Sequence, residues 1–106
     1  SPTPPTDVPD PFPLGDVNNA TEGIEYDATN CPVEITGAAF VSAPISLSGD
    51  ASAQYKINDG GWTSAGGTIY DGDLLYVHMT AGAGLTTCTV TIGDAEPEDF
   101  NITLTP

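Results

Sequence analysis

Short runs of alternating apolar and polar residues constrain the fold of this chain more than any other feature. From Phe12 onward these runs are separated by Gly, Asp and Asn, and no stretch shows a helical period. The runs occupy residues 31–37, 43–49, 52–58, 73–80, 85–93 and 99–105. Every second side chain of a strand points to the same face, so each run can bury one apolar face. The pattern predicts an all-β protein in which two antiparallel sheets pack as a sandwich.

The segment 73–80 shows what this alternation implies for chemistry. It directs Leu75, Val77 and Met79 inward and leaves Tyr76 and His78 outward. His78 is the only histidine, and no G-x-S-x-G motif surrounds any serine. A chain of 106 residues supports one thin core rather than a deep cleft. We therefore expect a solvated His78 and no enzymatic activity.

Residues 1–13 differ in composition from the rest, because they hold six of the ten prolines. Proline fixes φ and lacks a backbone donor, so this segment is predicted to be an extended arm. The arm would be a tether, or it would become ordered only against a neighbouring subunit. The predicted organisation is thus an arm at 1–13 and a sandwich at 14–106.

The sequence contains fifteen acidic residues and a single lysine, which gives a formal net charge of −14 at pH 7. Phosphate neutralisation requires Lys and Arg, so binding to nucleic acid is not expected. No apolar run approaches the 18 residues of a membrane span, so membrane insertion is not expected either. The charge indicates solubility in an extracellular medium, and docking on a basic partner or binding of a cation are the alternatives.

Calcium is the cation that the acidic turns favour, because Ca²⁺ takes carboxylate and carbonyl oxygens. The candidate ligands are Asp71, Asp73, Asp94, Glu96 and Asp99. The EF-hand spacing is missing, so solvated turns without a metal or other cofactor remain the primary expectation.

The two cysteines, Cys31 and Cys88, share parity with the inward residues of their predicted strands. We expect a structural disulfide across the sandwich, which would close a loop of about 58 residues and contribute about 4 kcal/mol. Buried free thiols are the alternative. A redox or metal role lacks the C-x-x-C spacing.

The segment 55–73 combines a turn with three of the eight aromatic residues. Asn58-Asp59-Gly60-Gly61 favours positive φ and predicts a tight hairpin turn. Four aromatic side chains could form a sugar-stacking strip: Trp62, Tyr55, Tyr70 and Tyr76. The primary expectation is that Trp62, just after the turn, is a plug over the end of the sandwich, and the aromatic strip is the alternative.

A family resemblance rests on the run YKINDGGWTS (55–64) with Gly67-Thr68, Gly72-Asp73 and Thr91-Ile92-Gly93. These motifs resemble immunoglobulin-like β-sandwich modules of bacterial surface or secreted proteins and of phage virion proteins. The likeness spans about residues 10–105, with Asp94 replacing a usual Gly. It implies a non-enzymatic module arrayed beside other domains or built into assemblies.

The expected function is therefore that of a structural module that decorates or builds a phage virion, a surface filament or a multidomain surface protein. Its expected location is extracellular, on a cell surface or on a virion. Its partners would be other protein subunits, or further copies bound through the proline-rich arm. The alternative is a carbohydrate-binding or adhesion module with a glycan partner.

Overall fold

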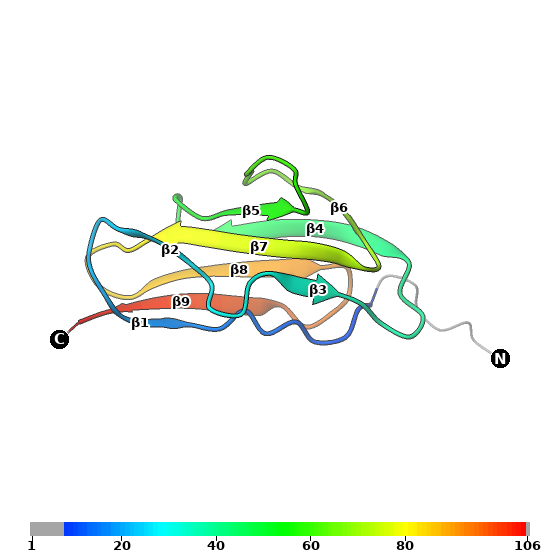
Figure 1. Ribbon diagram of the computed structural model, residues 1–106, viewed down its shortest axis with the longest axis horizontal. Coiled ribbons are helices and arrows are strands. Elements are labelled where there is room, and N and C mark those ends of the chain that lie inside the picture. Colours follow the sequence, from blue (N-terminus) through cyan, green and yellow to red (C-terminus); the bar gives the residue numbers. More distant parts are fainter. Residues whose placement is uncertain (1–7, 106) are drawn as a thin grey trace.

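The computed structural model describes residues 8–105, and this range forms two β-sheets without a helix (Figure 1). The strands are β1 (Val17–Ala20), β2 (Glu25–Asp27), β3 (Val33–Ile35), β4 (Ser42–Gly49), β5 (Gln54–Ile57), β6 (Gly67–Tyr70), β7 (Asp73–Thr80), β8 (Thr86–Ile92) and β9 (Glu98–Leu104). No helix that could cross a membrane therefore occurs between residues 8 and 105. The expectation of an all-β protein with two sheets is confirmed.

The larger sheet has the strand order β1-β9-β8-β4-β6, in which β1 runs parallel to β9 and the other neighbours are antiparallel. The smaller sheet is built around β7. His78 pairs with Asp27 of β2 and with Gln54 of β5, so β2 and β5 lie on opposite sides of β7. The strand β3 shares the β2 side, because Leu75 pairs with both Val33 and Ile57.

The core lies between the two sheets and follows the alternation of the strands. Leu75, Val77 and Met79 of β7 are fully buried, as predicted, and so are Val90 and Ile92 of β8. Burial of these apolar side chains stabilises the fold by about 25 cal/mol for each Å² of apolar surface that is removed from water. Hydrophobic burial is thus the interaction that holds the two sheets together.

The segment before β1 contributes to this core. Phe12 and Leu14 are each 1% exposed, and the Asp10 N–H donates to the carbonyl oxygen of Thr36 at 2.7 Å. Phe12 and Leu14, which lie on either side of the predicted boundary between residues 13 and 14, therefore both belong to the buried core. Residues 1–7 of the predicted arm lie outside the described part of the chain.

The predicted disulfide is not formed, and Cys31 and Cys88 are free thiols. Cys88 is fully buried, and Cys31 is half-buried against the same core. Strand parity thus gave the inward direction of both side chains. It could not give the sulfur–sulfur distance, which must match a narrow geometry before a bond forms. The alternative of free thiols is the one that the structure supports.

Candidate functional site

The outer face of the smaller sheet collects the only tryptophan, the only lysine and the only histidine of the chain. We call this group the outer patch. Its members are Trp62, Lys56, Gln54, Tyr76, His78, Glu25 and Asp27. They come from three neighbouring strands and from the connection between β5 and β6. Three strands distant in sequence, and the loop that follows one of them, therefore meet on one surface.

The β5–β6 connection folds back because of the turn chemistry at its start. Asn58 has a φ of 52°, a left-handed conformation that Asn tolerates better than most residues. Its Oδ1 accepts from the Leu74 N–H at 2.9 Å, and its Nδ2 donates to Asp73 Oδ1 at 3.0 Å. Beyond the turn, Tyr55 and Thr63 exchange two backbone hydrogen bonds of 2.9 Å each. This bridge holds Trp62 beside the sheet.

Trp62 covers His78. Their ring centroids are 3.6 Å apart with an interplanar angle of 17°, which is a stacked pair. His78 is consequently only 6% exposed. The expectation of a solvated histidine is wrong, although its outward direction was right. Alternation along β7 gives the direction of a side chain but carries no information about a distant loop that covers it.

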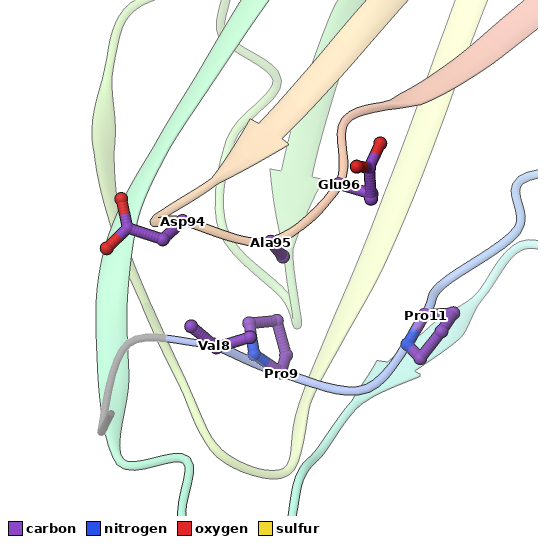
Figure 2. A pocket seen from close by; sticks show the side chains of 6 residues that line it. All are labelled: Val8, Pro9, Pro11, Asp94, Ala95 and Glu96. Atoms are coloured by element: carbon purple, nitrogen blue, oxygen red, sulfur yellow. The ribbon is translucent and has the colours of Figure 1, made fainter. Parts of the chain in front are cut away.

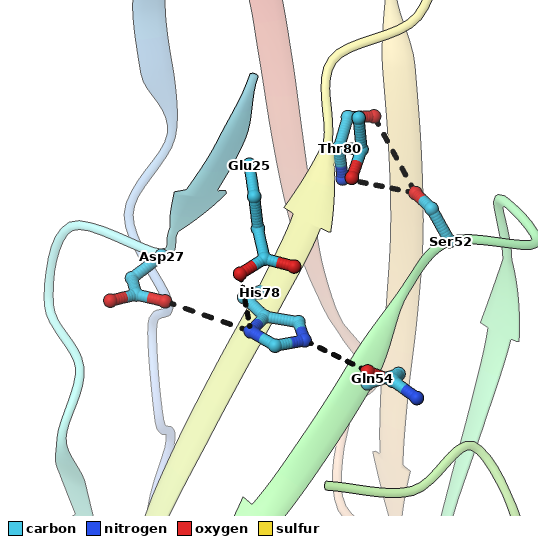
Figure 3. Close-up of polar contacts among 6 residues, drawn as sticks. All are labelled: Glu25, Asp27, Ser52, Gln54, His78 and Thr80. Atoms are coloured by element: carbon cyan, nitrogen blue, oxygen red, sulfur yellow. Dashed lines mark hydrogen bonds and ion pairs between the residues drawn. The ribbon is translucent and has the colours of Figure 1, made fainter. Parts of the chain in front are cut away.

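The imidazole of His78 also has polar neighbours on both sides (Figure 3). Nδ1 lies 3.4 Å from Glu25 Oε1 and 4.0 Å from Asp27 Oδ1, and Nε2 lies 3.0 Å from Gln54 Oε1. A general base must reach the proton that it removes from a substrate. Each nitrogen of this ring already faces a side chain of the protein, and Trp62 stacks on the ring.

Hydrogen bonds fix the end of β7 next to this histidine. The Thr80 N–H donates to Ser52 Oγ at 3.0 Å, and the same hydroxyl lies 3.5 Å from the carbonyl oxygen of Thr80 (Figure 3). Asp50 accepts from the Ser52 N–H at 3.0 Å, and its hydrogen bonds with Ser52 lower the pKa of the Asp50 carboxyl group. The turn before β5 is therefore tied to β7.

Lys56 lies between two aromatic rings of the outer patch. Its Nζ is 4.7 Å from the ring centroid of Tyr76 and 5.2 Å from that of Trp62. A cation at this distance from an aromatic face is attracted by the ring quadrupole, at about 0.5–1 kcal/mol for exposed sites. The contact limits the number of conformations that the long lysine side chain can adopt.

The four aromatic residues predicted as a strip are not together. Tyr55 is 2% exposed, its hydroxyl donates to the carbonyl oxygen of Ala65 at 2.6 Å, and burial raises the pKa of this phenol. Tyr70 is exposed, but it lies on β6 of the other sheet. Only Trp62 and Tyr76 share the outer patch. Trp62 covers a sheet face and does not plug the end of the sandwich.

Two of the predicted calcium ligands accept hydrogen bonds from the protein: Asp73 at the start of β7, and Asp99 on β9. Asp73 Oδ2 accepts from the Tyr70 N–H at 2.9 Å, and Asp99 Oδ1 accepts from Thr89 Oγ1 at 2.7 Å. Asp71 is exposed in the turn between β6 and β7. In the described part of the chain, no three His, Cys, Asp or Glu side chains are close enough to hold a metal ion.

Asp94 and Glu96 border a shallow pocket of about 300 Å³ between the β8–β9 turn and the N-terminal segment. Figure 2 shows Ala95 facing Pro9, with the two carboxylates directed away from them. Val8, Pro9, Pro11 and Ala95 form the apolar part of the lining. The pocket is therefore the space left where the N-terminal segment packs on the β8–β9 turn. The carboxylates of Asp94 and Glu96 do not point to a common position in it.

Lys56, Gln54, Glu25 and Asp27 were not recognised as site residues from the sequence. Gln54 and Lys56 alternate with Tyr55 and Ile57, so their shared outward face could have been inferred. Their place beside His78 depends on the pairing of β5 with β7, which alternation does not specify. Comparisons of the chain with protein-family models, curated proteins and solved structures found no match.

Proposed function

We propose that the chain is a non-enzymatic, immunoglobulin-like structural module that decorates or builds a larger extracellular assembly. The observation that carries this proposal is the position of the two ends of the described chain. Val8 and Pro9 pack at the β8–β9 turn, whereas the Thr105 N–H donates to Ala20 O beside the end of β9. These points lie at opposite ends of the sandwich (Figure 1). Such a module can be placed in line with neighbouring domains or subunits.

The immunoglobulin-like assignment is supported by strand order as well as by the sequence resemblance. Immunoglobulin sandwiches place strands C, F and G side by side in one sheet and B, E and D side by side in the other. The order β4-β8-β9 corresponds to the first set, and β2 and β3 with β7 and β5 correspond to the second. One difference is that β6, the neighbour of β4, follows β5 in the chain.

A structural role is also supported by how the reactive side chains are used. His78 is covered by Trp62 and contacted at both ring nitrogens. The thiol of Cys88 is buried, and burial raises its pKa to about 12. A cysteine nucleophile needs a low thiol pKa and an accessible sulfur. These groups are arranged for packing rather than for nucleophilic attack.

The acidic surface supports an extracellular location on a cell or a virion. With fifteen carboxylates and one lysine, copies of the domain repel each other at low ionic strength. Attachment then requires a specific contact, either with another subunit or with a second copy through the proline-rich segment. We propose that the binding partners of the chain are other protein subunits of the assembly.

Immunogold electron microscopy with an antibody raised against the isolated chain tests this function on intact cells and particles from the source. Gold in rows or clusters on the outer surface, abolished when the antibody is preabsorbed with the chain, is the expected result. Label confined to the cell interior would contradict the proposal. Analytical ultracentrifugation of the isolated chain then shows whether copies associate with each other.

A further inference from the structure

We propose that the outer patch is a binding site for a neutral oligosaccharide, with Trp62 as its stacking platform. This site goes beyond the structural function proposed above, and each could exist without the other. The starting observation is Trp62 itself, which remains 37% exposed while one ring face is stacked on His78. Large aromatic side chains with apolar faces provide much of the contact area in recognition sites.

The platform is preorganised before any ligand arrives. The stack on His78 has a centroid separation of 3.6 Å, and His78 is itself held between Glu25 and Gln54. The Tyr55–Thr63 bridge restrains the backbone next to Trp62. A side chain already fixed in its binding geometry loses little conformational entropy when a ligand binds. The rigidity is therefore useful for binding, in addition to stabilising the loop.

Groups that can donate or accept hydrogen bonds to sugar hydroxyls lie on the same sheet face as the Trp62–His78 stack. The carboxylates of Glu25 and Asp27 are 57% and 73% exposed and can accept. Lys56 can donate, and Figure 3 shows the amide nitrogen of Gln54 directed away from His78, where it can donate as well. Donors and acceptors that lie together beside an aromatic ring suit a polyhydroxylated ligand with both polar and apolar faces.

The charge of the patch selects a neutral ligand. An anionic glycan would meet Glu25, Asp27 and a molecule of net charge −14. A cationic peptide is attracted by the carboxylates all over this molecule of net charge −14, and the outer patch is the one place where Lys56, the only lysine, opposes that attraction. An uncharged sugar meets neither the repulsion that an anion meets nor the opposing charge of Lys56, so its binding depends on the stacking and hydrogen-bonding groups of the patch.

The shape of the patch favours a chain of sugars over a single unit. The patch lies on a sheet face and crosses β5, β7 and β2. Neighbouring strands are about 4.8 Å apart, so three strands span about 10 Å. A linear oligosaccharide lying across the strands can contact Gln54 and Lys56 of β5, the Trp62 ring that covers His78 of β7, and the carboxylates of β2.

The test is an NMR titration of the full chain with five neutral hexasaccharides: cellohexaose, xylohexaose, mannohexaose, maltohexaose and N-acetylchitohexaose. The chain has one tryptophan, so one indole N–H signal reports directly on the site. At least one of these probes is expected to shift that signal. Trp62→Ala lacks this reporter, so its binding is followed by the backbone amide signals of β5 and β7, and it should be weaker by about tenfold or more. Tyr70→Ala, which removes an exposed aromatic on the other sheet, should not change binding.

Two further variants keep the result interpretable if Trp62→Ala disturbs the fold. Gln54→Ala and Lys56→Met leave the ring in place and should each weaken binding several-fold. Binding that is unchanged in all three patch variants would overturn the site. Shifts of equal size with a heparin hexasaccharide would overturn the choice of a neutral ligand. Absence of binding to all five neutral probes would overturn the proposal, without bearing on the structural function that immunogold tests.

Discussion

Cys88 lies fully buried in the core, and desolvation raises the pKa of its thiol to about 12. An unfolded cysteine titrates near about 8.5. Between these values the folded protein holds a proton that the unfolded chain has lost, so the free energy of unfolding falls as pH rises. The contribution is complete below about pH 8.5. Burial raises the pKa of Cys31 in the same direction.

We therefore predict that the chain becomes less stable as the pH rises from about 8.5 to 10, by up to about 1.4 kcal/mol per pH unit from Cys88. Urea denaturation at a series of pH values measures this slope. The variant Cys88→Val removes the titrating group while keeping an apolar side chain of similar size, and its slope should be shallower. Equal slopes for the two proteins would show that Cys88 does not titrate as described.

At the scale of a single strand, β4 ends at Gly49, whose φ is +108°. A Cβ at this position would lie 2.6 Å from the carbonyl oxygen of Thr87 and 2.7 Å from the Cα of Cys88. Gly84 also has a positive φ of 123°, but it has open space around its Cα. A substitution at Gly84 would thus test backbone strain alone, whereas one at Gly49 would test backbone strain together with the close approach of β4 and β8.

Gly84→Ala is predicted to cost about 1–2 kcal/mol, because only the backbone conformation is strained. Gly49→Ala should cost clearly more, since β8 must also move away from β4. Thermal or chemical unfolding of the two variants makes the comparison. A Gly49→Ala variant as stable as Gly84→Ala would contradict the close approach of the two strands.

Alternation predicted the long strands well, because seven or eight consecutive residues show both faces of a strand. β7 was predicted at its observed bounds, and β4, β8 and β9 were predicted to within one residue at each end. β3 and β5 are shorter than expected. β1, β2 and β6 were not predicted, since three or four residues such as Glu25–Asp27 contain too few apolar positions to show a period.

The site was less accessible to sequence reasoning than the strands were. The Asn58–Gly61 turn could be predicted, and so could the outward direction of His78. The stack of Trp62 on His78 depends on where the chain goes after the turn and on which strand lies next to β5. Both are tertiary relations that local periodicity does not determine.

The N-terminal segment shows how an element without regular structure can still belong to the core. Phe12 is 1% exposed, whereas its neighbour Pro11 is exposed. Phe12→Ala is predicted to lower the free energy of unfolding by about 3–5 kcal/mol. Pro11→Ala, one residue away, should change it by less than about 1 kcal/mol. A Phe12→Ala effect in urea denaturation as small as that of Pro11→Ala would contradict the packing of Phe12 in the core and would favour a separate arm.

At the scale of the whole molecule, three residue types that occur once each are united on one sheet face. Trp62 comes from a loop, Lys56 from β5 and His78 from β7, while fifteen carboxylates are distributed along the sequence. The two termini of the described range lie at opposite ends of the sandwich, and neither covers this face (Figure 1). A module held in line through its ends would therefore keep the outer patch accessible.

The most direct test of this account is a nuclear Overhauser measurement between the Trp62 indole and the His78 imidazole in the isolated chain. Both residues are unique, so their signals need no ambiguous assignment. The stacked geometry predicts cross-peaks between the rings and ring-current-shifted imidazole protons, which move towards unfolded values in Trp62→Ala. Absence of cross-peaks, with identical His78 signals in the two proteins, would contradict the preorganised outer patch.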